Sequence, residues 1–335
     1  MSDVQKFLAE NNQPEYRLQQ FNHAYYQQLI TSFDELTTWS KDLRSKLQQL
    51  PFSSLKLIKT ISTPKKDTIK ALFSLVRNPQ AKMETVLMRH DDGRNTVCIS
   101  CMVGCPVGCA FCATGQMGLK EKLTTQEIID QILYFARWLK DKEEKVSNVV
   151  YMGMGEPMLN LDVVEESIDI LINPKKVGMS QRRLTVSTAG FPSQIRQFVD
   201  DGYDQLNLAI SLHAPNQELR KKIMPIAKTF SMKKLFAAID YYVQQCNKRV
   251  SYEYILLKGV NDQDKHAREL AILLRNRLAH VNLIPYNPVL GVKYEKPSKK
   301  KVLRFAQILT DRSISNSIRV TMGAEIDAAC GQLAA

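Results

Sequence analysis

The chain of 335 residues carries 46 lysines and arginines against 34 aspartates and glutamates, which gives a formal net charge of +12. Its hydrophobic content of 44% excludes a globally disordered protein, and no apolar run approaches the roughly 20 residues of a membrane-spanning helix. Because the first residues also lack the basic-then-apolar layout of a signal peptide, we expect a cytoplasmic protein with no membrane partner, and the basic surplus indicates a polyanionic partner, usually a nucleic acid.

Short helices are expected over the first eighty residues. Ser32 and Glu35 have the spacing of a capping box. Apolar residues then recur at roughly helical spacing, at Phe33, Leu36, Leu43 and Leu47. Because lysine and arginine are frequent here, we interpret residues 1–80 as a small helical accessory domain that either binds nucleic acid or only caps the main domain at 81–335.

Strands and helices alternate from about residue 84 onward. A helix is expected over 124–140, where Thr124 and Glu127 form a second capping-box pattern. Alternation of this kind indicates parallel βα units, and the absence of a G-x-G-x-x-G after the first strand favours an α/β partial (β/α)6 barrel over a dinucleotide-binding sheet. The six predicted strands are 96–100, 148–153, 183–187, 206–212, 250–257 and 280–286.

The segments that follow these strands share a composition rich in Gly, Pro, Ser and other polar residues. Ligands gather at the carboxyl ends of parallel strands, so we expect one site built from these segments. They read CMVGCPVGCAFC, MGEP, STAG, SLHAP and YNP.

Five of the seven cysteines lie between residues 98 and 112. Cys105, Cys109 and Cys112 have the spacing C-x3-C-x2-C, and in a reducing compartment such a group is more often metal-binding than a disulfide framework. Structural zinc normally takes four ligands, and no histidine lies nearby to complete a tetrahedron. The pattern instead suits a [4Fe–4S] cluster with one iron left open for substrate. A chance grouping of structural cysteines is the remaining alternative.

The motif resembles the radical S-adenosylmethionine (radical SAM) superfamily, and its surroundings resemble the RlmN/Cfr RNA methyltransferases within it. The segment SFDELTTWSKDLR extends the resemblance into the helical region and is closer to the RlmN side. Other matching stretches are DGRNTVCIS, VGCPVGCAFCATGQMG, NVVYMGMGEPMLN, RRLTVSTAG, AISLHAPN, NLIPYNP and EIDAACGQL.

The resemblance implies that the three cysteines hold a [4Fe–4S] cluster whose open iron binds S-adenosylmethionine, with two S-adenosylmethionine molecules used per turnover. Gly155 and Glu156 match the segment that contacts the methionine end of this cofactor. Without the resemblance, His213 at a strand end is more often a structural histidine. The further matching cofactor contacts are Ser187, Ser211, Leu212, His213 and Asn287.

The resemblance also implies a covalent mechanism on adenine. Cys330 takes a methyl group and becomes S-methylcysteine, and a radical formed on that methyl adds to the ring. Glu84 matches the base that then removes the ring proton. Cys98 attacks the sulfur of Cys330, forms a disulfide and frees the product. The alternative for Cys98 is a small buried residue on a strand.

The implied partners are 23S ribosomal RNA near the peptidyl-transferase centre, the anticodon loop of some tRNAs, and an electron donor such as flavodoxin or ferredoxin. Residues 293–305, 173–183 and the helical region are the expected RNA contacts, or else solvated surfaces. Two competing functions stay open: Cfr-type methylation at adenine C8, which confers antibiotic resistance, and a non-catalytic metal-stabilised RNA-binding protein.

Two departures from the family pattern concern thiols and the tail. Cys101 stands where serine is expected, and it adds a fifth local thiol that competes for iron or for the disulfide. Only five residues follow Cys330, fewer than in many relatives. Cys246 lies outside every motif, and we interpret it as structural or incidental.

Overall fold

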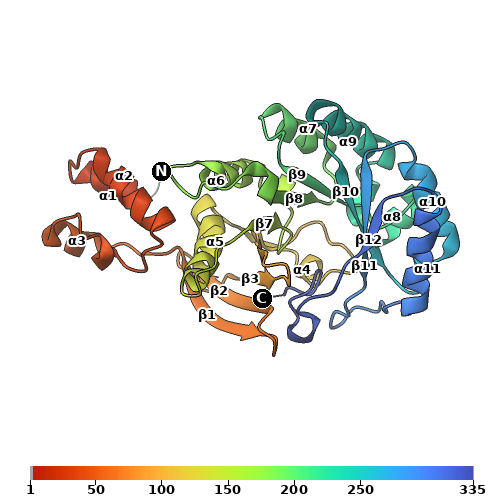
Figure 1. Cartoon of the computed structure of the whole chain (residues 1–335), viewed down its shortest axis with the longest axis horizontal. Helices are drawn as coiled ribbons and strands as arrows, with labels where there is room; N and C mark the ends of the chain where they lie inside the picture. The colour runs from red at the N-terminus through yellow and green to blue at the C-terminus, as the bar shows by residue number, and fades with distance from the viewer. Residues whose placement is uncertain (1–2, 335) are drawn as a thin grey trace.

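A computed structural model describes residues 3–334 and shows one large curved sheet with helices on its outer side (Figure 1). Within these residues the sheet has ten strands in the order β1-β2-β3-β4-β7-β8-β9-β10-β11-β12. Its centre is the six predicted strands, which pair in parallel and confirm the partial barrel. They are β4 (Asn95–Cys98), β7 (Asn148–Tyr151), β8 (Leu184–Thr188), β9 (Asn207–Ser211), β10 (Val250–Leu256) and β11 (Ala279–Pro285).

The predicted helix after β4 is α5 (Thr125–Lys140), and its capping box between Thr124 and Glu127 is formed. Helices likewise follow the other parallel strands and cover the outer face of the sheet (Figure 1). A short strand, β12 (Asn316–Ile318), then pairs in parallel with β11. These helices are α6 (Leu161–Ile172), α7 (Pro192–Asp200), α8 (Gln217–Ile223), α9 (Met232–Cys246), α10 (Asp264–Leu274) and α11 (Lys299–Thr310).

The N-terminal region is helical as far as residue 47, but its helices are shorter than the sequence pattern suggested. The capping box of Ser32 and Glu35 is present on a single 3-10 turn. Ser40 accepts a hydrogen bond from the backbone of Leu43, and it thereby starts a separate helix. The helix expected here is therefore interrupted between the 3-10 turn at Phe33–Glu35 and the helix that begins at Lys41. The helices are α1 (Asp3–Glu10), α2 (Tyr16–Asn22), continued by a π-helical turn at His23–Gln27, and α3 (Lys41–Leu47).

The prediction of helix through residue 80 is wrong for residues 55–75. These residues form an antiparallel hairpin of β1 (Leu55–Ser62) and β2 (Thr68–Leu75), and β2 pairs with β3 (Lys82–Arg89). Strand β3 in turn pairs with β4, so one sheet crosses the proposed boundary at residue 80. The runs LKLIKTIS and TIKALFSL contain β-branched and aromatic residues that favour strands once neighbouring strands are available to pair.

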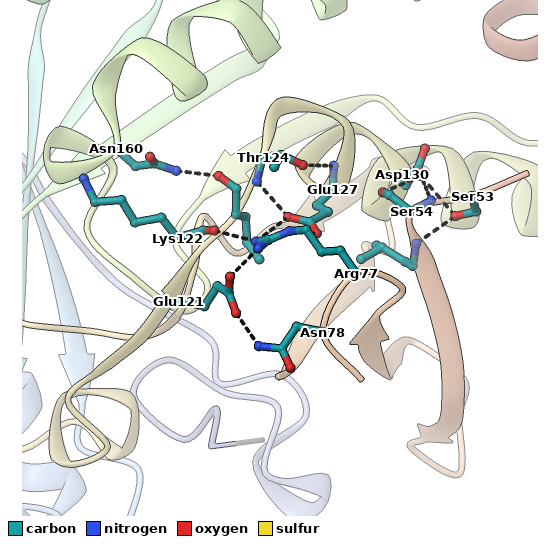
Figure 2. Close-up of polar contacts among 12 residues, drawn as sticks. Ser53, Ser54, Arg77, Asn78, Glu121, Lys122, Thr124, Glu127, Asp130 and Asn160 are labelled. Atoms are coloured by element: carbon teal, nitrogen blue, oxygen red, sulfur yellow. Dashed lines mark hydrogen bonds and ion pairs between the residues drawn. The ribbon is translucent and has the colours of Figure 1, made fainter. Parts of the chain in front are cut away.

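Two polar networks fix the base of this hairpin to the barrel (Figure 2). The buried carboxylate of Asp130 on α5 accepts hydrogen bonds from Ser53 Oγ at 3.0 Å and from Ser54 N at 2.7 Å, just before β1. It also accepts one from the hydroxyl of Tyr25 at 2.5 Å. After β2, Arg77 pairs with Glu121 and Glu127, which follow the cysteine-rich loop. The helical region, the hairpin and α5 are therefore joined through the buried carboxylates of Asp130 and Glu127.

We expect Asp130→Ala to lower the free energy of unfolding by about 3 kcal/mol, because it leaves several buried donors without an acceptor. Urea denaturation followed by circular dichroism measures the change. Asp141→Ala removes an exposed carboxylate beside the end of the same helix, and it should change stability by less than about 0.5 kcal/mol. Equal effects of the two substitutions would contradict the role given to Asp130.

Candidate functional site

A cavity of about 540 Å³ opens where the parallel strands end, and it is lined by most of the predicted site residues. Glu84 and Leu212 are predicted site residues outside its lining. Segments between residues 86 and 333 meet there. The predicted residues in the wall are Cys98, Cys105, Cys109, Cys112, Gly155, Glu156, Ser187, Ser211, His213, Asn287 and Cys330.

The loop with Cys105, Cys109 and Cys112 follows β5 (Met102–Gly104), which forms a small two-stranded sheet with β6 (Leu119–Lys122). A backbone hydrogen bond of 3.1 Å from Cys112 N to Cys109 O closes the loop. Burial raises the pKa of all three thiols, that of Cys105 to about 12. Metal binding must therefore displace protons from them.

The three thiols fit a [4Fe–4S] cluster in that they share one cavity wall. Within residues 3–334, no three His, Cys, Asp or Glu side chains converge as the ligands of a single metal ion would. The protein ligands of a [4Fe–4S] cluster bind separate iron atoms, so convergence on one point is not what this group requires.

The surroundings of Arg220 on α8 also fit a [4Fe–4S] cluster at this site. Its side chain is fully buried, and it donates to the carbonyl oxygens of Leu212 at 3.1 Å and of Ala189 at 2.5 Å. Its Nη1 has no hydrogen-bond partner among the described residues, although burial lowers the pKa of the guanidinium only to about 10. An unpaired buried donor is costly. The charge of Arg220 interacts with Cys109, and an anionic cluster on that thiol would supply the missing acceptor.

Gly155 and Glu156 follow β7 and line the same cavity as the cysteines. Gly155 has φ +106°, and a Cβ there would lie 2.7 Å from Cβ of Met102 and 2.9 Å from Sγ of Cys101, so only glycine fits. The buried carboxylate of Glu156 accepts hydrogen bonds from Ala189 N at 2.7 Å and from the backbone of the 3-10 turn that follows it. Burial raises the pKa of this carboxyl group to about 7.

His213 is buried at the end of β9, with its ring 4.8 Å from that of Phe111 in the cysteine loop. Its Nδ1 accepts a hydrogen bond of 3.1 Å from Ile255 N, which leaves the proton on Nε2. Burial lowers the pKa of the imidazole to about 3, so it is a neutral donor at pH 7. Leu212 is fully buried, and only its backbone takes part, through the bonds to Glu253 and Arg220.

The C-terminal segment forms part of the cavity wall and brings Cys330 to the cavity. Asn287 Nδ2 donates to Cys330 O at 3.4 Å. Ala113, next to the cluster cysteines, donates from its backbone to Gly331 O at 2.8 Å, and Thr114 Oγ1 donates to Leu333 O at 2.6 Å. Cys330 thus lies in the same cavity wall as Cys98 and Cys112.

Cys98 ends β4 and is buried. Burial, with a smaller effect of the neighbouring Cys330, raises the pKa of its thiol to about 12, against the lowering effect of Arg319. Cys98 is therefore a weak nucleophile in this state, since the thiolate is the reactive form. For Cys98 to react, its thiol must lose its proton. The positive charge of Arg319 favours that loss, and so would a more polar environment.

Glu84 on β3 holds the tail. One carboxylate oxygen pairs with Lys70 Nζ at 2.9 Å, and the other accepts a hydrogen bond of 2.9 Å from Ala334 N. Lys70 also donates to Asp327 O at 3.0 Å. Both oxygens of this buried group are thus occupied while the tail is docked.

Arg319 and Glu253 also line the cavity, although no motif marks them. Arg319 Nη1 lies 3.8 Å from Glu253 Oε2, and the proximity of Cys330 raises the pKa of the guanidinium. Arg319 follows directly after β12, and this position at the end of a parallel strand could have marked it as a site residue. That strand was not predicted from the sequence.

Cys101 and Cys246 lie outside the cavity wall. Cys101 is buried beneath Gly155. Cys246 is buried at the end of α9, as expected of a structural residue. All seven cysteines are free in this structure.

The predicted basic surfaces differ in their surroundings. Lys293, Lys296, Lys299 and Lys300 are exposed. In residues 173–183, however, Pro174 O accepts a hydrogen bond from Gln27, so this segment also packs on the helical region. No helix in the described part of the chain has the length and apolar character needed to cross a membrane.

Comparisons with known proteins agree with one another. The family model described as the Radical SAM superfamily matches residues 99–271. A Protochlamydia amoebophila protein named probable dual-specificity RNA methyltransferase RlmN 2 is 42% identical over 330 residues, which cover 98% of this chain and 91% of that protein. A Bacillus pumilus protein named probable dual-specificity RNA methyltransferase RlmN is 41% identical over 336 residues, covering 100% and 92%. The crystal structure of a radical SAM methyltransferase from Sphaerobacter thermophilus superposes with a TM-score of 0.94 at 42% identity, over 99% of this chain and 96% of that one.

Proposed function

Since this chain belongs to the radical SAM superfamily and, within it, to the RlmN RNA methyltransferases, we propose that it methylates carbon 2 of an adenosine in 23S ribosomal RNA and of the anticodon-loop adenosine of some tRNAs. Membership in this family argues against a non-catalytic RNA-binding protein and against a zinc site, because the family implies a [4Fe–4S] cluster and S-adenosylmethionine. We also infer a cytoplasmic location and an electron donor such as flavodoxin or ferredoxin.

One observation supports the proposed mechanism most directly. Cys98 and Cys330 lie in the same cavity wall as the three cluster cysteines, although 232 positions separate them in sequence (330 − 98). A mechanism that methylates one thiol and resolves the product with another requires this proximity. A chain that used its cluster only for structure would not require it.

The residues present fit the cluster and its cofactor. When bound, the two together would supply one-electron radical chemistry. Cys105, Cys109 and Cys112 would hold the cluster, with Arg220 Nη1 as a donor toward it. Glu156 would accept from the ammonium group of S-adenosylmethionine, and the neutral His213 would donate from Nε2. Ser187, Ser211, Asn287 and the backbone of Gly155 complete the proposed cofactor contacts.

The chain's own residues then divide the transfer to RNA. Cys330 carries the methyl group as S-methylcysteine and becomes joined to adenine through the methyl carbon. Glu84 takes the proton from the ring carbon once its carboxylate is free of the tail. Cys98, as the thiolate, attacks the sulfur of Cys330 and forms a transient disulfide. The carbon–sulfur bond to the product breaks, and the released carbon keeps the electron pair and takes a proton, which completes the methyl group.

Incubation with S-adenosylmethionine carrying a trideuterated methyl group tests this proposal. Mass spectrometry of the RNA should find two deuterium atoms in the transferred group, because one hydrogen of the methyl is removed on Cys330. Fragmentation should place the group on carbon 2 of adenosine. Transfer of three deuterium atoms would contradict the mechanism, and a product methylated only at carbon 8 would assign the Cfr-type activity instead.

The pH dependence of cofactor binding tests Glu156. Burial holds the pKa of this carboxyl group at about 7, so it is mostly protonated below pH 7, and the ammonium of the cofactor prefers the ionised form. Affinity for S-adenosylmethionine should therefore fall by about tenfold per pH unit below pH 7 and level off above it. Calorimetry on the cluster-loaded protein measures this.

Glu156→Gln should weaken binding at pH 8 by about tenfold or more, since a hydrogen bond to a charged group contributes about 1.5–3 kcal/mol, and should flatten the pH profile. The matched control is Glu165→Gln. Glu165 lies on α6 outside the cavity wall, and its pKa is also raised to about 7. A pH profile that is lost in the control and kept in Glu156→Gln would rule out the assignment.

A further inference from the structure

Strand β1 is an edge of the sheet, and it is exposed along almost its whole length. Every residue from Lys56 to Ser62 is exposed, although the strand is well paired with β2 on its other side. The exposed residues include apolar ones, with Ile58 at 45% and Ile61 at 36%. Edge strands of this kind are available to a partner unless the protein protects them.

The register of the sheet places part of β1 on the same face as the catalytic cavity. Side chains of paired residues lie on the same face of neighbouring strands, so the face can be followed from strand to strand. The pairs on this face are Lys56 with Ser74, Lys59 with Leu72, Ile61 with Lys70, Leu72 with Glu84, Lys70 with Val86, and Val86 with Cys98. The exposed lysines of β1 therefore lie on the face that carries Glu84 and Cys98.

This hairpin surface, defined here as Lys56, Lys59, Lys65 and Lys66, carries uncompensated positive charge. None of the four lysines has an ion pair or a side-chain hydrogen bond in the described part of the chain, and all four are exposed. The one acidic residue of the hairpin, Asp67, accepts a hydrogen bond from Thr63 at 2.6 Å. Four unpaired cations on a chain of net charge +12 are complementary to a polyanion.

The distance from this surface to the site is short and fixed. Neighbouring strands are about 4.8 Å apart, so β1 lies about 14 Å from β4. The base of the hairpin is held on one side by the hydrogen bonds of Ser53 and Ser54 to Asp130, and on the other by the pairs of Arg77 with Glu121 and Glu127 (Figure 2). A polyanion on β1 would therefore be positioned relative to Cys98.

We propose that the hairpin surface binds the phosphates of the RNA strand next to the nucleotide that enters the cavity. The inference rests on the proposed function, and within residues 1–80 it moves the expected RNA contact from the helices to the β1–β2 hairpin. RNA is favoured over a second copy of the chain for two reasons. The lysines of β1 would repel the same lysines of β1 in a second copy. The register shift at Ile58 also disturbs the regular hydrogen bonding that a neighbouring strand would need.

The experiment compares two double variants of the full, cluster-loaded protein. Lys56→Gln with Lys59→Gln removes two charges from the hairpin surface. Lys233→Gln with Lys234→Gln removes two exposed charges from α9, on the outer side of the barrel (Figure 1). Fluorescence anisotropy with a labelled RNA stem-loop that has unpaired adenosines measures Kd over a series of salt concentrations. S-adenosylmethionine binding and methyl transfer are measured in parallel.

The hairpin variant should bind the stem-loop about tenfold more weakly at 0.1 M salt, and the slope of log K against log salt should fall by about 1.4, since each single-strand phosphate contact contributes about 0.7. Its S-adenosylmethionine binding should be unchanged, and the α9 variant should match the wild type in every assay. Equal affinity and slope in the two variants would overturn the inference, because the lysines would then only protect the edge. A dimer that forms through β1 and is unaffected by RNA, seen by light scattering, would also overturn it. Wild-type protein that transfers no methyl group to RNA would instead refute the proposed function.

Discussion

Cys98→Ala protein is expected to accumulate as a covalent complex with RNA. Addition of the methyl carbon on Cys330 to adenine does not need Cys98, whereas release of the product does. The other three thiols of the cavity wall are the proposed cluster ligands, so we expect no other group to replace Cys98 efficiently, and nearly every active enzyme molecule should become trapped in a single turnover. A denaturing gel with labelled RNA should show a band of protein size that disappears after nuclease treatment.

Cys246→Ala is the matched control for this experiment, since Cys246 is buried outside the cavity and should form no complex. The combined change of Cys98 and Cys330 to alanine should form none either, because the attachment point is gone. Recovery of free Cys98→Ala enzyme together with methylated RNA would refute the resolving role of Cys98. It would also leave the raised pKa of that thiol as the property of an ordinary buried cysteine.

Cys330→Ala protein is expected to transfer no methyl group to RNA while it keeps its cluster. Cys330 belongs to the tail, which contacts the cluster loop through the backbone of Ala113 and the hydroxyl of Thr114. Its thiol is not one of the three proposed ligands. Iron and sulfide contents and the visible spectrum should therefore equal those of the wild type, whereas RNA methylation falls below detection.

A Cys105→Ala variant completes the comparison, because it should lose both the cluster and the activity. If Cys330→Ala also lost iron, the tail thiol would be a ligand and the division of the cysteines proposed here would be wrong. If it retained methyl transfer, the covalent route through S-methylcysteine would be excluded.

The parallel core and the cysteine loop could be predicted because their signals are local. Each strand is a short apolar run with its own turn residues, and the capping box at Thr124 and Glu127 marks the start of α5 within four residues. The spacing of the three cysteines likewise lies within eight positions, from 105 to 112. Such patterns do not depend on the rest of the fold.

The hairpin and several site residues could not be predicted because their roles depend on distant partners. Strand β1 has few buried residues, and it is a strand because β2 and β3 extend the sheet to it. Arg220 is an ordinary helical residue in sequence, and only the carbonyl groups that end β8 and β9 give it a buried position. The contact of Glu84 with Ala334 joins residues 250 positions apart.

The contact between Glu84 and Ala334 implies that the tail must detach before Glu84 can act in the role proposed for it. With Lys70 on one oxygen and Ala334 on the other, each oxygen of Glu84 already has a protein partner while the segment after Cys330 is docked. Under the role proposed for it, Glu84 becomes a competent base only when that segment detaches, and the incoming nucleotide is what needs the space. Arrival of the substrate would thereby switch on its own deprotonation, and the enzyme without RNA would keep its base masked.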